Sequence, residues 1–187
     1  MGGSVDDGSG EMTQPAETQE KDESVVHTFE VGDWAVHPSH GVGRVTAIEE
    51  KSFGEAVSLV YVMNIVGSEL KVMVPMTAAQ VVGLRPVMQA HDAEELFAVL
   101  ATQEAAVATQ TWNRRFRAYT EMLASGSPTE IAKVLRDMNR LKFDKDLSFG
   151  ERRLLDQARN LLVEEMALAL DQTAEAITAR VDGIFSN

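Results

Sequence analysis

The sequence contains no cysteine, which excludes disulfide bonds, thiolate metal sites and cysteine nucleophiles. It also lacks any apolar run approaching the roughly 20 residues that a membrane-spanning helix needs. The first ten residues contain neither a positively charged region nor an apolar segment, so we do not expect a secretory signal. We therefore expect a cytoplasmic protein that makes no contact with a membrane.

Basic residues are few, and the formal net charge is −12. Such a charge, taken alone, argues against nucleic-acid binding, because phosphates repel acidic surfaces. However, residues 1–30 hold eight acids and one base, so they account for −7 and leave −5 for residues 31–187. Residues 112–117 contain three arginines and no acid. The local sign of the charge therefore keeps nucleic-acid binding open.

Motifs for catalysis and cofactor binding are also missing. Gly41-Val-Gly43 lacks the third glycine of a dinucleotide-binding turn, and neither a phosphate-binding GxxxxGK[ST] loop nor a G-x-S-x-G motif occurs. His37 and His40 lie three residues apart with Asp33 nearby, which leaves a weak metal site as the alternative to an exposed turn. We favour the turn, and expect no enzyme, no cofactor and no metal.

The composition divides the chain into three parts. Residues 1–27 are mostly Gly, Ser, Gln, Thr and acids, which predicts a disordered acidic tail. Residues 28–88 are rich in β-branched side chains and predict a small SH3-like barrel. Its five short strands are expected at 33–38, 42–48, 57–65, 70–74 and 82–86, with a hairpin turn at 67–69.

Residues 89–187 change to the helical period of apolar positions. Capping boxes at Ser127–Glu130 and Ser148–Glu151 mark two helix starts. Five helices are expected at about 92–101, 110–124, 128–142, 149–170 and 173–185. The predicted fold class is α+β, with a β-module followed by an all-α module.

One segment, Thr111–Tyr119, has the composition of a binding site. Arg114, Arg115 and Arg117 follow Trp112 at a helix start, where free N–H groups and guanidinium groups suit phosphate. Trp112 shares a helical stripe with Phe116, Tyr119 and Leu123, so its spacing alone favours core packing. The alternative is an apolar wedge that unstacks a base step, as in minor-groove binding proteins.

Arg152 and Arg153 lie in the first turn of a predicted helix. This placement opposes the helix macrodipole, so helix stability does not explain it. Two interpretations remain: a soluble surface, or a phosphate-binding track that continues to the Arg114 cluster.

Several ordered motifs together resemble the CarD/CdnL family of bacterial transcription regulators. The first motif is Phe29-Glu-Val-Gly-Asp-Trp-Ala-Val-His-Pro38, followed by His40-Gly-Val-Gly43. The others are Val72–Pro75, Val82–Arg85, Thr111–Phe116, Ile131–Asp137 and Leu147–Leu155. The resemblance covers about residues 29–185.

The resemblance implies a transcription factor that stabilises the open promoter complex. A Tudor/SH3-like module at 28–88 would bind the RNA polymerase β subunit, and a helical module at 89–187 would contact promoter DNA at the upstream edge of the bubble. Trp112 would be the minor-groove wedge. The expected DNA contacts are Arg114, Arg115, Arg117, Arg152 and Arg153, and the expected polymerase contacts are Lys51, Met63, Met73 and Pro75.

A protein-only adapter, which binds polymerase and another regulator without touching DNA, is the alternative function. In that case Trp112 would be a core residue. We expect a monomer in both cases.

Overall fold

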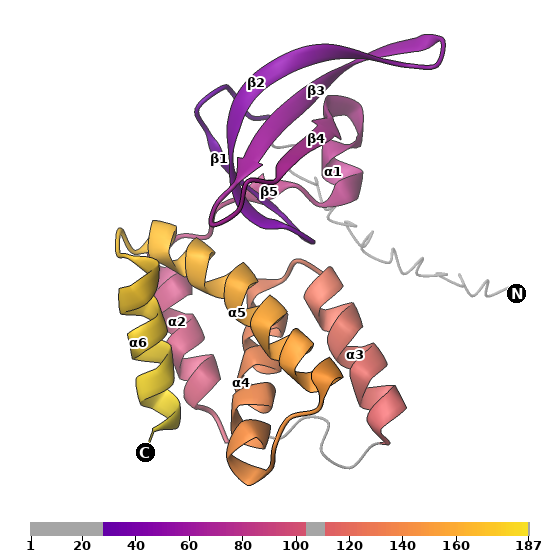
Figure 1. Cartoon of the computed structure of the whole chain (residues 1–187). Coiled ribbons are helices and arrows are strands. Elements are labelled where there is room, and N and C mark those ends of the chain that lie inside the picture. Colours follow the sequence, from indigo (N-terminus) through magenta and orange to yellow (C-terminus); the bar gives the residue numbers. More distant parts are fainter. Residues whose placement is uncertain (1–27, 104–110, 187) are drawn as a thin grey trace, which may run out of the picture.

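The computed structural model describes residues 28–103 and 111–186. The predicted acidic tail at 1–27 lies outside this range. Figure 1 shows a β-module at one end of the molecule and a helical module at the other. The predicted fold class, β followed by all-α, is confirmed.

The β-module is one antiparallel sheet with the strand order β4-β3-β2-β1-β5. Its strands are β1 (Trp34–His37), β2 (Gly41–Phe53), β3 (Ala56–Ile65), β4 (Lys71–Pro75) and β5 (Arg85–Pro86). The sheet curls, and β2 and β3 continue beyond it as a two-stranded hairpin (Figure 1). Because the strand order leaves β4 and β5 at the two edges, closure into an SH3/Tudor-like barrel stays a prediction.

Two strands differ from the sequence prediction. β2 runs on to Phe53 through a polar stretch, because residues 49–53 pair in register with β3. The last strand is shorter than predicted. The short helices η1 (Met76–Ala78) and α1 (Ala79–Val82) precede it, and Gly83 ends α1 with a φ of +86°. A positive φ favours glycine, so this residue stops the helix and redirects the chain.

Alternate residues of the strands point into the core of the β-module. Tyr61 and Met63 of β3 lie on this inner face and are almost fully buried. The ring of Phe29 packs edge-on against Tyr61, with the ring centroids 5.8 Å apart. The core is completed by Ala35, Val45, Val74, Ala79 and Leu84.

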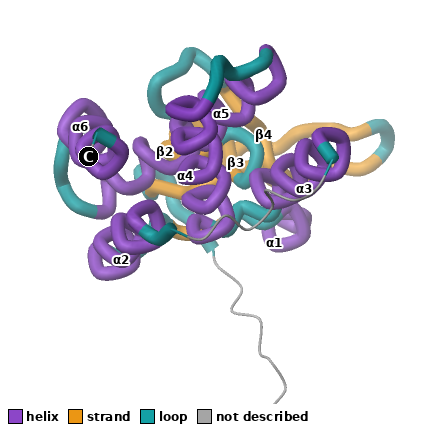
Figure 2. The backbone as a smooth tube through the Cα atoms, turned by 90° about the horizontal axis from the view of Figure 1, so that it is seen from below, coloured by secondary structure: helices purple, strands orange, loops and turns teal. Residues whose placement is uncertain are grey.

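The five helices of the second module lie within a few residues of their predicted bounds. They are α2 (Ala90–Ala101), α3 (Trp112–Ala124), α4 (Pro128–Asp144), α5 (Phe149–Ala169) and α6 (Ala174–Phe185). Ser127 and Ser148 accept hydrogen bonds from the backbone N–H groups of Glu130 and Glu151, as the capping motifs predict. Seen from below, α4 and α5 lie between α3 on one side and α2 and α6 on the other (Figure 2).

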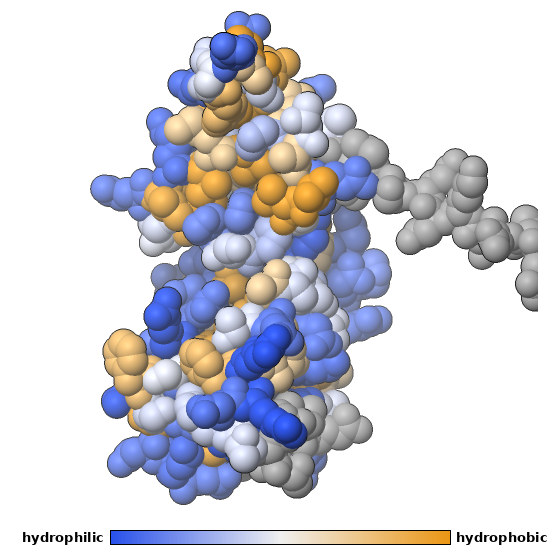
Figure 3. All heavy atoms as spheres, turned by 90° about the vertical axis from the view of Figure 1, so that its right-hand side faces the viewer, coloured by the Kyte–Doolittle hydropathy of each residue, from blue (hydrophilic) through white to orange (hydrophobic). Residues whose placement is uncertain are grey.

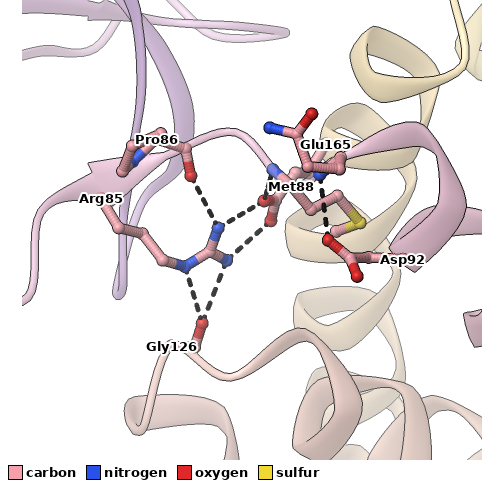
Figure 4. Close-up of polar contacts among 7 residues, drawn as sticks. Arg85, Pro86, Met88, Asp92, Gly126 and Glu165 are labelled. Carbon is pink, nitrogen blue, oxygen red and sulfur yellow. Dashed lines mark hydrogen bonds and ion pairs between the residues drawn. The ribbon is translucent and has the colours of Figure 1, made fainter.

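A buried ion pair joins the two modules (Figure 4). The Glu165 carboxylate on α5 is 1% exposed and accepts hydrogen bonds from both terminal nitrogens of Arg85, one of them at 2.8 Å. It also accepts from the backbone N–H of Met88 at 3.0 Å. The same guanidinium donates to the carbonyl of Gly126, in the turn between α3 and α4. One arginine thus connects β5, α5 and the α3–α4 turn.

Candidate functional site

Trp112 begins α3 and lies against the first turn of α5. Its ring centroid is 5.4 Å from that of Phe116. A Cβ atom at Gly150 would lie 3.2 Å from Trp112 Cζ2, so a side chain at that position would press on the indole. Trp112 is half-buried, and the described structure therefore shows both a packed side and an accessible side of this residue. Gly150 is a supporting residue that the sequence analysis treated only as part of a helix cap.

The arginines of α3 have different surroundings. Arg114 and Arg117 are exposed, whereas Arg115 is half-buried with its guanidinium carbon 5.9 Å from the centre of the Trp112 ring. Arg117 donates to the Glu121 carboxylate at 2.9 Å. Thr111 makes no side-chain capping bond; its carbonyl accepts from the N–H groups of Arg114 and Arg115.

Arg152 and Arg153 are exposed near the start of α5, where they follow Gly150 and the buried Glu151. Because Gly150 touches the Trp112 ring, the structure places the starts of α3 and α5 next to each other. The predicted DNA-contact residues therefore gather at one end of the helical module. Figure 3 views the molecule from the α3 side and shows strongly hydrophilic surface there beside a few hydrophobic side chains.

Carboxylates hold half of the lysines and arginines that the structure describes in the helical module, and two basic residues of the β-module. The ion pairs within residues 28–103 and 111–186 involve Lys51, Arg85, Arg117, Lys133, Arg136, Lys145, Arg159 and Arg180. Within these same ranges Arg114, Arg115, Arg152 and Arg153 belong to no such pair, and neither do Arg44, Lys71, Arg140 and Lys142. Arginines that keep their donors free are available to bind phosphate oxygens.

Glu151 holds the start of α5 in place. Its carboxylate accepts from the Ser148 backbone N–H at 2.8 Å and from Lys145 Nζ at 2.9 Å, and its side chain is 2% exposed. Burial by itself would raise the pKa of Glu151, but the bonds from Lys145 and Ser148 together lower that pKa below its ordinary value. The group therefore stays ionised and keeps its donors.

A second network holds α3. Tyr119 donates its hydroxyl to Asp137 at 3.0 Å, and Asp137 also accepts from Arg136 at 2.9 Å. Arg136, which is 2% exposed, donates in turn to Thr102 after α2. Burial and the adjacent Asp137 raise the pKa of Tyr119, so its hydroxyl remains protonated and donates. The network fixes α3 against α4.

The predicted polymerase contacts divide between the two faces of the sheet. Residues paired across strands share a face, and the faces alternate along a strand. Met73 pairs with Val62, Pro75 with Val60 and Lys51 with Ser58. Lys51, Met73 and Pro75 therefore share the face of the sheet opposite Met63, which we call the β4 face; Val60 and Val62 on this face are buried. Met73 is 52% exposed on it.

Met63 lies on the opposite face of β3 and is 0% exposed. Its side chain packs in the core of the β-module and has no surface to offer a partner. The prediction that Met63 is a contact residue is therefore corrected: it supports the sheet from inside. Its sequence context could not reveal this, because Met63 and Met73 are both methionines in apolar strands.

Two histidines lie side by side at the turn between β1 and β2, with their rings tilted relative to each other. The rings of His37 and His40 are 4.6 Å apart, and His37 Nδ1 accepts the Ser39 N–H at 3.2 Å. Burial and the neighbouring His40 lower the pKa of His37. Across the described ranges no three His, Cys, Asp or Glu side chains gather as a metal site. Nor does any helix described here combine the length and the apolar character needed to span a membrane.

Both modules match known families. Residues 29–88 match the CarD-like/TRCF RID domain, and residues 95–182 match the CarD C-terminal domain. The chain is 31% identical over 149 residues to the "Putative transcription factor YdeB" of Bacillus subtilis (strain 168), which covers 80% of this chain and 97% of that protein.

Matches in both modules, on a sheet followed by a helical bundle, define a transcription regulator. The protein belongs to the CarD/CdnL family.

Proposed function

We propose that this protein binds RNA polymerase through its β-module and promoter DNA through the starts of α3 and α5, and thereby stabilises the open complex. One observation carries the proposal. In an acidic chain, four arginines without a carboxylate partner in the described ranges lie near the starts of two helices that meet at the half-buried Trp112.

The geometry around Trp112 suits a wedge. A side chain that enters the minor groove must keep its shape while it unstacks a base step, which costs a few kcal/mol. Phe116 and Gly150 pack against the indole, and Arg115 covers part of its face. Arg114, Arg115 and Arg117, together with Arg152 and Arg153 on α5, would hold the adjacent phosphates.

The β4 face suits a protein partner. β4 is an edge strand, so one side of its backbone has free N–H and C=O groups with which a partner strand can pair. Met73 and Pro75 add apolar area beside that edge, and Lys51 adds a charge on the same face. The match to the CarD-like/TRCF RID domain supports polymerase as the partner.

The mechanism needs no catalysis. A factor that contacts both polymerase and DNA only in the open state shifts the equilibrium towards that state. A preference of ~1.4 kcal/mol corresponds to a tenfold change in population. Docking through the β4 face raises the effective concentration of the arginine cluster near DNA, so a weak DNA contact suffices.

The test is the lifetime of open complexes formed by purified polymerase on a ribosomal-RNA-type promoter. We expect the wild-type protein to lengthen the lifetime, and Trp112→Ala to abolish most of this effect at unchanged polymerase affinity. Trp112→Phe keeps an aromatic ring against Gly150, and Trp34→Ala removes the other tryptophan, so these variants separate a wedge from a folding defect. A wild-type protein without effect on the lifetime would overturn the proposal.

A protein-only adapter remains the second candidate, because Trp112 is half-buried and packs on the helical core. An adapter predicts that Arg114→Glu leaves the open-complex lifetime unchanged. The DNA-binding proposal predicts a marked loss, since the substitution places an acid beside phosphates.

A further inference from the structure

A groove of about 690 Å³ separates the β-module from α5. One wall consists of β-module residues: Ser39, His40, Ile65, Ser68 and Leu70. The other consists of one side of α5: Phe149, Arg152, Arg153, Asp156, Gln157, Asn160 and Leu161. The groove is therefore built by both modules, and nothing in the function proposed above uses the β-module wall.

The lining has the chemistry of an anion site. Arg152 and Arg153 face no ion-pair partner within residues 28–103 and 111–186, and Asp156 is the one carboxylate among the described lining residues. The rest of the polar lining consists of hydroxyl, amide and imidazole groups, which can donate hydrogen bonds to phosphate oxygens without adding negative charge.

The two walls are fixed relative to each other. The Arg85–Glu165 ion pair joins the two modules. Gly41 lies so close to α5 that an added Cβ would be 3.4 Å from Leu161 Cδ2. At the other turn, a Cβ on Gly67 would be 3.5 Å from Glu164. Because these contacts hold the walls in place, a ligand can enter a preformed site with little ordering cost.

The groove and the Trp112 site meet adjacent residues at the start of α5. Phe149, which is 81% exposed, lines the groove, and the next residue, Gly150, touches the Trp112 ring. Arg152 and Arg153 follow Gly150 within one turn of α5, a rise of about 5 Å, so a strand that reaches Trp112 would have both arginines within a short distance.

We propose that this groove binds the sugar–phosphate backbone of one promoter DNA strand, and that the β-module contributes contacts to it through Ser39, His40 and Ser68. This inference rests on the proposed function, and it adds a second DNA-binding surface on the module otherwise assigned to polymerase. Both modules would then contact the same DNA strand.

Charge neutralisation provides a gain-of-function test. Asp156→Asn removes the repelling carboxylate from the groove, and we expect the open-complex lifetime to increase about threefold at low salt. Asp171→Asn makes the same chemical change beyond the far end of α5, where the residue has a φ of +52° that asparagine tolerates. The expected result is no change for this control. Equal lifetimes for Asp156→Asn and wild type would overturn the groove proposal, and a folding defect cannot mimic an increase.

Tethered cleavage distinguishes the groove from the Trp112 site. The chain has no cysteine, so Ser68→Cys, Asn113→Cys and Ser52→Cys each provide a single thiol for an iron chelate that cleaves nearby DNA. Ser68 lies at the groove, Asn113 in the first turn of α3, and Ser52 near the end of the β2–β3 hairpin.

We expect cleavage near the upstream edge of the bubble from positions 68 and 113, and none there from position 52. Cleavage from position 113 alone would overturn the groove proposal and leave the proposed function intact. Cleavage from neither position 68 nor 113 would contradict the proposed function as well. Equal cleavage from position 52 would show that cleavage reports only that the protein is near the DNA. This result would also overturn the groove proposal.

Discussion

The two modules differ in how their proposed contact surfaces are made. The β4 face offers an exposed strand edge and apolar side chains such as Met73, and the charge of Lys51 is already paired with Glu49 at 2.8 Å. Near the starts of α3 and α5, Arg114, Arg115, Arg152 and Arg153 form no ion pair with any carboxylate in residues 28–103 and 111–186. An apolar edge suits a protein surface, whereas free arginines suit phosphate.

The comparison teaches that the arginines of this protein serve two purposes. Arg136 and Arg85 are buried or half-buried and fully engaged with protein acceptors. Arg114 and Arg152 are exposed. A count of basic residues therefore overstates the binding surface, and the carboxylate partners decide which arginines remain for DNA.

The junction between the modules should show the largest effect on stability. Glu165→Ala leaves Arg85 and the Met88 N–H without their buried acceptor, and we expect a loss of about 4 kcal/mol in the free energy of unfolding. Urea denaturation measures this loss. The neighbouring Glu164→Ala is the control, and it should change stability by much less, because Glu164 is only half-buried. Equal effects of the two would show that the ion pair does not hold the modules together.

In the β-module, Met63 should contribute to stability and Met73 to polymerase binding. Met63→Ala leaves a cavity in the core and should cost about 3 kcal/mol in unfolding free energy. Met73→Ala should cost under about 0.5 kcal/mol, since the side chain is largely exposed. Polymerase affinity, measured on the folded proteins, should fall only for Met73→Ala. The reverse pattern would contradict the assignment of the β4 face.

The carboxylate of Glu151 should give the α5 start a dependence on pH. Its lowered pKa means that its stabilising effect is fully present above the ordinary carboxyl value and is lost as the pH falls through the lowered one. Glu151→Gln should therefore be less stable than wild type by about 1–2 kcal/mol at neutral pH. That difference should shrink below about pH 4. Paired denaturation curves between pH 7 and pH 3 measure it, and a difference that stays constant would refute this account.

The smallest effect is expected at the surface pair of Arg117 and Glu121. Both side chains are exposed, so Glu121→Gln should cost only about 0.3 kcal/mol of stability. The same substitution releases Arg117, and we expect a modest increase in open-complex lifetime. Arg117→Ala should in turn reduce the lifetime less than Arg114→Ala does. A larger loss from Arg117→Ala would indicate that the Glu121 pair does not restrain this arginine.

Much of the fold could be predicted from residue patterns. The caps at Ser127 and Ser148 begin α4 and α5 where the motifs place them, because capping depends on residues three positions apart. The end of β2 at Phe53 could not be predicted in this way, since a polar stretch becomes a strand only through its pairing with β3. The helix at 79–82 was also missed, because two consecutive valines favour a strand by local propensity.

The sequence by itself determined the order of the modules, the helix starts and the identity of the family, because these follow from local spacing and from motifs in one continuous chain. Only the tertiary structure decided that Met63 is buried while Met73 is exposed, that Gly150 braces Trp112, and that Glu165 holds Arg85. These contacts join residues far apart in the chain. Their energies depend on burial and on partner geometry, neither of which is encoded in any short segment.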